Sequence, residues 1–231
     1  MRKALIIFFL LPYILYPNSD NSGEYKTSFR LLLTPTAYLP EKTYLSSTDI
    51  AGLSFGCKLS DKISMAIITV PLLSFSFGFK YQLYNNRNLN ISTGSGFWYS
   101  MEEVDFDDMK GKLLIFSQQL ITTFGNNRKS LNFSIGINPY KEDGEKSYFP
   151  INLNFGGYLS FTDHIQLIID TSLIKMLKSK GNFRFHDVLA GGLRFSWEKS
   201  SLDLAICKYD SEIAWENNII IPIITYTRYF K

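Results

Sequence analysis

The chain has 231 residues, a formal net charge of +3 and many aromatic rings, with 19 Phe and 14 Tyr. Its length fits a single domain, because β-barrels often exceed about 200 residues without dividing. The small net charge excludes a field strong enough to recruit nucleic acid. Only 19% of the residues are charged while 16% are aromatic, and this balance favours β-strands over other elements.

The first residues predict an export signal. Arg2 and Lys3 precede an apolar stretch over residues 4–15. This stretch is too short to span a bilayer as a helix, which needs about 20 apolar residues, and its charged start is typical of a signal peptide. We therefore expect a signal peptide over residues 1–22 and a barrel domain over 23–231, with a short N-terminal membrane anchor as the alternative.

Strict alternation of apolar and polar residues begins at Leu73. One face of this run carries Leu73, Phe75, Phe77, Phe79, Tyr81 and Leu83, and the other carries Ser74, Ser76, Gly78, Lys80 and Gln82. Similar runs cover 131–138, 151–161, 189–197 and 202–206. A period of two places successive side chains on opposite faces of a strand, and many runs approach the about 9–11 residues that cross a membrane at a tilt.

Short and long connections alternate between these runs. Tight turns are predicted at 85–87, 125–128, 162–163 and 198–200, and longer polar segments at 101–110, 140–147, 176–182 and 210–217. An up-and-down barrel with short periplasmic turns and long outer loops requires this order.

Further strands are predicted at 50–59 and 62–70, after a first strand somewhere between Ser28 and Ser47. We therefore expect an all-β protein, an up-and-down antiparallel transmembrane β-barrel of twelve strands. Ten strands are the alternative if the region before Asp49 is a loop or a plug.

The polar face of the strands would line a lumen. The predicted lumen-lining residues are Lys80, Gln82, Asn152, Asn154, Asp170, Arg184, His186, Arg194 and Asp203. They carry charges of both signs, and opposite charges inside a narrow barrel pair to fill it more often than they conduct selectively. We therefore expect structural ion pairs among them.

No catalytic residue is predicted. A hydrolase needs a nucleophile and a histidine base that takes its proton, and the chain has only His164 and His186. His164 falls in a predicted turn. Two residues after His186 the strand carries Val188, where a lipid A deacylase-like arrangement has serine. A lipid-modifying enzyme would need a serine from another strand, and this stays an alternative.

The sequence gives no reason to expect a metal or another cofactor. Two separated histidines and two cysteines offer no spacing suited to zinc. The acidic segment 102–108 lacks the glycine and the final glutamate of a calcium-binding loop. Cys57 shares a strand face with Phe55, whereas Cys207 shares a face with Asp203, so we expect both thiols to stay free because they lie on opposite sides of the wall.

Aromatic residues gather near the predicted strand ends. They are Phe97, Trp98, Tyr99, Trp197, Tyr226, Tyr229 and Phe230. Rings at a membrane interface keep a polar edge in water and their body among acyl chains. We therefore expect these residues to form aromatic girdles.

The last stretch, over residues 219–231, resembles the closing strand of bacterial outer-membrane β-barrels. Phe230 would be the terminal aromatic residue, with Ile224 and Tyr226 on its face. The resemblance implies contact with outer-membrane lipid and recognition by the barrel-insertion machinery. Residues 34–42, which read Thr-Pro-Thr-Ala-Tyr-Leu-Pro-Glu-Lys, resemble the Pro-Thr-Ala leader of several poorly characterised outer-membrane barrel families, including some associated with exopolysaccharide.

Together these features predict a protein of the outer membrane of a double-membraned bacterium. Its expected role is non-enzymatic, as a narrow pore or as a surface module whose outer loops meet an external ligand that the sequence does not identify. One alternative is the lipid-modifying enzyme. The other is a soluble secreted carrier of lipocalin type, in which the phenylalanine rows would point inward.

Overall fold

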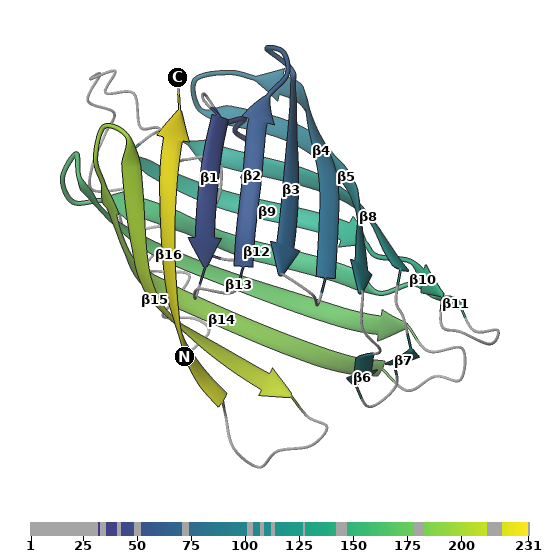
Figure 1. Cartoon of the computed structure of the whole chain (residues 1–231). Coiled ribbons are helices and arrows are strands. Elements are labelled where there is room, and N and C mark those ends of the chain that lie inside the picture. Colours follow the sequence, from purple (N-terminus) through teal and green to yellow (C-terminus); the bar gives the residue numbers. More distant parts are fainter. Residues whose placement is uncertain are drawn as a thin grey trace.

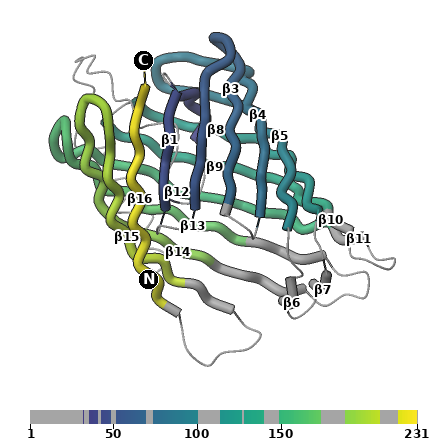
Figure 2. Tube along the Cα trace, viewed as in Figure 1, coloured from purple at the N-terminus to yellow at the C-terminus, as the bar shows by residue number. Residues whose placement is uncertain are grey.

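A computed structural model describes residues 32, 36–40, 43–48, 52–70, 74–100, 104–106, 109–111, 114–126, 128–141, 147–177, 183–211 and 219–230, whose course Figure 2 traces. Only the backbone is described at 70, 104–111, 140–148, 174–177, 183–187, 209–211 and 219 within these ranges. The predicted signal peptide over residues 1–22 lies outside the described residues. Among those that are described, no helix is long and apolar enough to span a membrane.

Twelve antiparallel strands form one closed barrel (Figure 1). They are β1 (Thr43–Thr48), β2 (Gly52–Lys58), β3 (Ile63–Val70), β4 (Ser74–Asn85), β5 (Leu89–Ser100), β8 (Leu114–Gly125), β9 (Lys129–Ile137), β12 (Ile151–Ser160), β13 (Ile165–Leu177), β14 (Phe183–Ser196), β15 (Ser200–Ser211) and β16 (Ile219–Phe230). The ring closes where β1 pairs with β16 and where β8 pairs with β9. The predicted twelve-stranded up-and-down barrel is confirmed, and the ten-strand alternative is wrong because the region before Asp49 contributes β1.

Two of the longer connections carry short hairpins. One pairs β6 (Val104–Phe106) with β7 (Met109–Gly111), and the other pairs β10 (Tyr140–Lys141) with β11 (Ser147–Tyr148). The sequence predicted polar loops at both places. Strand β10 also pairs with the first residues of β8. This connection therefore adds a short pair of strands to the sheet at one end of the barrel.

The predicted tight turns join strands at one end of the barrel, which we call the turn end. The backbone N–H of Asn86 donates to the Leu89 carbonyl at 2.9 Å, and that of Trp197 donates to the Ser200 carbonyl at 2.8 Å. Gly125 closes β8 with a φ of 121°, a left-handed conformation that favours glycine. The C-terminal end of β16 lies at the turn end (Figure 1). We call the opposite end the loop end.

An exposed ion pair holds the turn between β2 and β3. The Nζ of Lys58 donates to Asp61 Oδ1 at 2.8 Å. This hydrogen bond, helped by the charge of the ammonium, lowers the pKa of the Asp61 carboxyl below its usual value. Lys58 is the last residue of β2 and Asp61 lies in the turn that follows, so the pair belongs to the solvated end of the structure.

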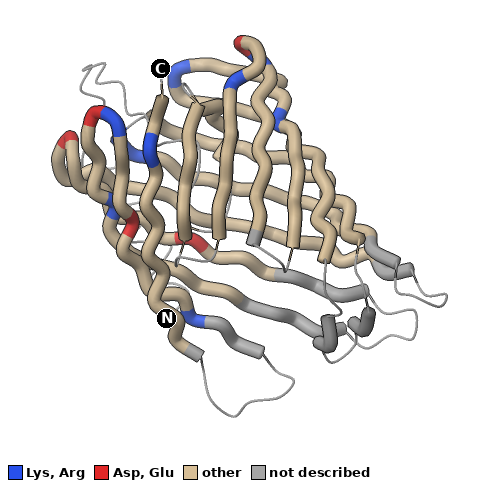
Figure 3. The backbone as a smooth tube through the Cα atoms, in the orientation of Figure 1, with Lys and Arg blue, Asp and Glu red and all other residues tan. Residues whose placement is uncertain are grey.

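The barrel wall is apolar outside and polar inside. On β9, Phe133 is 44% exposed while its neighbour Asn132 is 1% exposed, and on β15 the same contrast separates Leu204 from Asp203. Figure 3 shows few charged residues along the described strands, with most of them near the turn end. This is the arrangement that hydrocarbon requires of a barrel exterior. The lipocalin-type alternative is wrong, because its phenylalanines would have to face inward.

Two of the predicted girdle residues point the other way. Trp98 lies on the same face of β5 as the buried Ser92 and Ser100, and Tyr229 is buried. Strand alternation therefore turns both rings toward the lumen. The sequence placed them by their distance from strand ends, and that distance does not determine which face a residue occupies.

The two cysteines are free, as predicted. Cys57 on β2 is half-buried and Cys207 on β15 is buried. Since Cys207 shares the inward face of Asp203 and Cys57 lies between the inward Gly56 and Lys58, the wall separates the two thiols.

Candidate functional site: the barrel lumen

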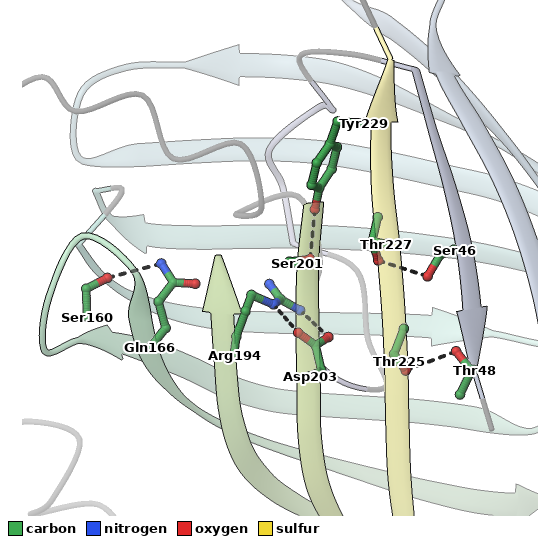
Figure 4. Close-up of polar contacts among 10 residues, drawn as sticks. All are labelled: Ser46, Thr48, Ser160, Gln166, Arg194, Ser201, Asp203, Thr225, Thr227 and Tyr229. Carbon is green, nitrogen blue, oxygen red and sulfur yellow. Dashed lines mark hydrogen bonds and ion pairs between the residues drawn. The ribbon is translucent and has the colours of Figure 1, made fainter. Parts of the chain in front are cut away.

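A buried ion pair joins two of the predicted lumen residues. Arg194 on β14 lies directly opposite Asp203 on β15. Its Nε donates to Asp203 Oδ1 at 2.7 Å and its second nitrogen, Nη2, donates to Oδ2 at 2.9 Å (Figure 4). Both side chains are 1% exposed. This bidentate geometry satisfies both carboxylate oxygens, and it is the structural pairing that the mixed charges predicted.

Hydroxyl and amide groups join neighbouring strands around this pair. Figure 4 shows these contacts, which are Ser201 with Tyr229 at 3.2 Å, Ser46 with Thr227 at 2.9 Å, Thr48 with Thr225 at 3.0 Å, and Gln166 with Ser160 at 3.1 Å. All of them link side chains on the inward face of the wall. Many polar side chains that face the lumen therefore form hydrogen bonds with other side chains of the wall.

The structure places the other predicted lumen residues as follows. Asn154 is buried and its Nδ2 donates to Ser134 at 2.8 Å. Asn152 and Asp170 are buried on β12 and β13. Arg184 and His186 belong to β14, but their side chains lie outside the described part of the chain.

A segment of the chain before β1 lies inside the barrel. Residues 36–40, which we call the leader, contribute Thr36 and Ala37, both completely buried. Lys80 donates through its Nζ to the carbonyl of Thr36 at 2.9 Å and to that of Tyr38 at 2.7 Å. Gln82 donates to the Ala37 carbonyl at 3.3 Å. Two predicted lumen residues on β4 therefore hold the backbone of the leader.

Strand β8 holds the leader from another side. The Ala37 N–H donates to Thr123 Oγ1 at 2.8 Å, and the Tyr38 hydroxyl donates to the Gly125 carbonyl at 3.2 Å. Thr123 in turn donates to Asn132 on β9 at 2.7 Å. Because Gly125 ends β8, these contacts place the leader near the turn end.

Sequence reasoning missed Thr123 and the leader contacts. The alternation within β8 was available as a signal for the inward face of Thr123, but its partner lies 86 residues away along the chain. For the region before Asp49, the sequence predicted a strand, with a loop or plug as the alternative. The structure has both a strand, β1, and a segment that fills part of the lumen.

Apolar residues also line part of the lumen. Leu32 packs against an inward cluster formed by Ala190, Ala205, Cys207 and Ile223, and against a second formed by Tyr158 and Ile168. Leu32, which precedes the leader, therefore contacts the β12–β16 side of the barrel.

A cavity of about 560 Å³ lies beside the leader. Its wall-side lining includes Ser54, Ala66, Gly78, Gly94, Gly96 and Gln119. Leu32 and Pro40, the last residue of the leader, also line it. The small side chains on β2 to β5 leave this space open. At Gly96 a Cβ would lie 2.6 Å from the carbonyl oxygen of Phe77, so the close approach of β4 and β5 requires glycine there.

Of the two histidines, only His164 has a described side chain. His164 is exposed in the turn between β12 and β13, and its Nδ1 lies 2.9 Å from the carbonyl oxygen of Ser196. This contact ties one tight turn to the end of β14. Over the described ranges, no group of three or more His, Cys, Asp or Glu side chains could hold a metal ion.

No protein-family model matches the sequence, and no curated protein matches it either. Among solved structures, the outer-membrane OmpT of Vibrio cholerae is similar with a TM-score of 0.53 and 6% identity, over 78% of this chain and 64% of that chain. The KdgM porin, solved in complex with disordered oligogalacturonate, is similar with a TM-score of 0.52 and 10% identity, over 82% of this chain and 98% of that chain.

These likenesses show the fold alone, which is that of bacterial outer-membrane β-barrels. The chain spans 64% of the length of the OmpT structure and nearly all of the KdgM structure. The resemblance of residues 34–42 to Pro-Thr-Ala leaders has no counterpart in these comparisons and stays a prediction.

Proposed function

We propose that this protein is a non-enzymatic barrel of the outer membrane of a double-membraned bacterium, and that its lumen is a narrow pore. The apolar exterior and polar interior support the membrane location. The observation that carries the pore is the cavity of about 560 Å³ inside the barrel, beside the leader. Its volume lies in the range of about 300–1,000 Å³ that is usual for small-molecule sites, so the lumen has room for a small solute.

In this proposal the leader restricts the passage at the turn end. Five hydrogen bonds join the wall and the leader: Lys80 and Gln82 donate to leader carbonyls, whereas Thr123 and the Gly125 carbonyl accept from the leader. Two of these come from one ammonium group, and charge-assisted hydrogen bonds are about twice as strong as neutral ones. Lys80 is therefore the main anchor of the leader rather than a residue that selects ions.

Conductance in planar bilayers tests the proposal. Wild-type protein should give small steps, and Lys80→Met and Thr123→Val should each enlarge the steps or lengthen the open times, because each removes a contact with the leader. The matched controls are Lys58→Met, which removes an exposed lysine of the turn, and Thr171→Val, which removes a hydroxyl from the outward face of β13. Both controls should behave as wild type.

The same contacts favour a second function, a surface module with a closed lumen. The leader and the pairing of wall side chains would then shut the barrel permanently, and only the outer loops would act. In that case none of the variants conducts, although all of them remain folded. If wild type and both leader variants instead gave steps of equal size, the protein would be a pore, but the leader would not control its conductance.

We also propose that the protein does not hydrolyse lipid. The ring of His164 is bonded to a backbone carbonyl in an exposed turn, which does not suit a general base. Purified protein should leave phospholipid and lipid A substrates intact. If the wild-type protein hydrolysed either substrate and His186→Ala did not, the lipid-modifying enzyme would replace this proposal.

A further inference from the structure

The outward face of the described barrel wall carries a polar cluster among apolar residues. It consists of Gln118 on β8 with Thr93 and Ser95 on β5, and we call it the Gln118 cluster. Gln118 lies directly opposite Ser95 in the pairing of these strands. Between the strand ends, Gln118 is the only Asn or Gln on the outward face of the described wall.

The cluster is bonded internally. Gln118 Nε2 donates to Thr93 Oγ1 at 2.8 Å, and the Ser95 hydroxyl donates to Gln118 Oε1. The Thr93 hydroxyl donates to the backbone carbonyl of Gln119 at 2.9 Å. These contacts hold the Gln118 amide in one orientation against the wall.

The amide keeps unused bonding capacity. A glutamine side chain offers two N–H donors and an oxygen with two lone pairs, and the cluster uses one donor and one lone pair. Gln118 and Ser95 are both exposed. On a surface that faces acyl chains, which neither donate nor accept hydrogen bonds, the remaining N–H and lone pair have no partner in lipid.

We propose that the Gln118 cluster is a contact surface between two copies of this chain in the membrane. A glutamine amide is self-complementary, because it presents a donor beside an acceptor. Two copies related by a two-fold axis place the same residue on both sides of the contact, so the two Gln118 amides can pair reciprocally. Polar side chains hold membrane-embedded segments together in this way.

The surroundings of the cluster fit such a contact. Phe116 and Leu120, two residues before and after Gln118 on the same face of β8, are 54% and 45% exposed. They flank the amide with apolar surface, which packs against the same residues of a second copy. The proposal concerns the outside of the barrel and is independent of conduction through its lumen.

The test compares two adjacent glutamines on opposite faces of β8. Gln118→Leu removes the proposed contact, and Gln119→Leu, which changes a residue lining the internal cavity, is the matched control. Dimerisation is measured by photobleaching of single labelled molecules in lipid bilayers over a range of protein densities. Gln118→Leu should weaken the dimer by about tenfold, as expected for hydrogen bonds between membrane-embedded segments, and Gln119→Leu should dimerise as wild type does.

Cross-linking gives a second measurement that does not alter the amide. In a background of Cys57→Ser and Cys207→Ser, Leu120→Cys should form a disulfide-linked dimer in membranes, and Leu204→Cys on β15 should not. Mobility on a gel before and after boiling shows that each variant is folded. The proposal is overturned if the wild-type protein is monomeric in lipid at every density, whether it is alone or bound to another membrane protein. It is also overturned if the two leucine variants weaken the dimer equally, or if both cysteine variants cross-link equally.

Discussion

At the scale of single residues, the Arg194–Asp203 pair shows what a lumen of this kind demands. Both side chains are 1% exposed and share two hydrogen bonds. A buried ion pair contributes little net stability compared with apolar residues, but removing one partner leaves an uncompensated charge. The pair therefore acts mainly to fix β14 against β15, because only one register places the guanidinium opposite the carboxylate.

Asp203→Asn tests this interpretation. The amide has the size of the carboxylate but not its charge, so the buried Arg194 loses the negative charge with which it shares two hydrogen bonds. We expect the free energy of unfolding to fall by about 3–5 kcal/mol, measured by denaturant titration in detergent micelles. Asp61→Asn, at the exposed pair with Lys58, should leave the midpoint nearly unchanged, because exposed pairs contribute little. Equal effects of the two substitutions would contradict the argument.

At the scale of elements, period-two alternation assigns each strand a lipid face and a lumen face. The assignment made from sequence for residues 73–84 and 131–138 agrees with the burial of β4 and β9. It was wrong for Trp98 and Tyr229, where the distance from a strand end was used in place of the alternation. The reliable signal is thus the phase of the strand and not the kind of side chain.

Spin labels can measure this phase directly. A label at Phe133→Cys should collide readily with oxygen dissolved in the bilayer, whereas a label at Asn132→Cys, one residue earlier on β9, should not. The pair Phe75→Cys and Ser76→Cys on β4 should repeat the contrast. The physical reason is that adjacent residues of a strand lie on opposite sides of the wall. Reversed accessibility at both pairs would place the apolar rows inside the barrel and contradict the fold.

At the scale of the whole molecule, closure of the barrel decides stability. Each of the twelve barrel strands pairs on both sides, with β1 joined to β16 and β8 to β9. A closed barrel has no free strand edge and must lose many hydrogen bonds together when it opens. We expect detergent-extracted protein to migrate faster on a gel when unboiled than when boiled, since the barrel stays compact in the first case. Identical mobility would contradict a closed barrel.

The amino-acid sequence by itself determined the class of fold, the phase of the clearest strands and the positions of the turns, and it left the count at twelve or ten strands. It could do so because alternation and turn chemistry are local. Within each strand, adjacent residues show which face meets lipid and which face meets the lumen. Only the tertiary structure decided what fills the lumen. The contacts of Ala37 with Thr123 and of Lys80 with the leader join segments 86 and about 40 residues apart, and closure of the ring, not local pattern, brings them together.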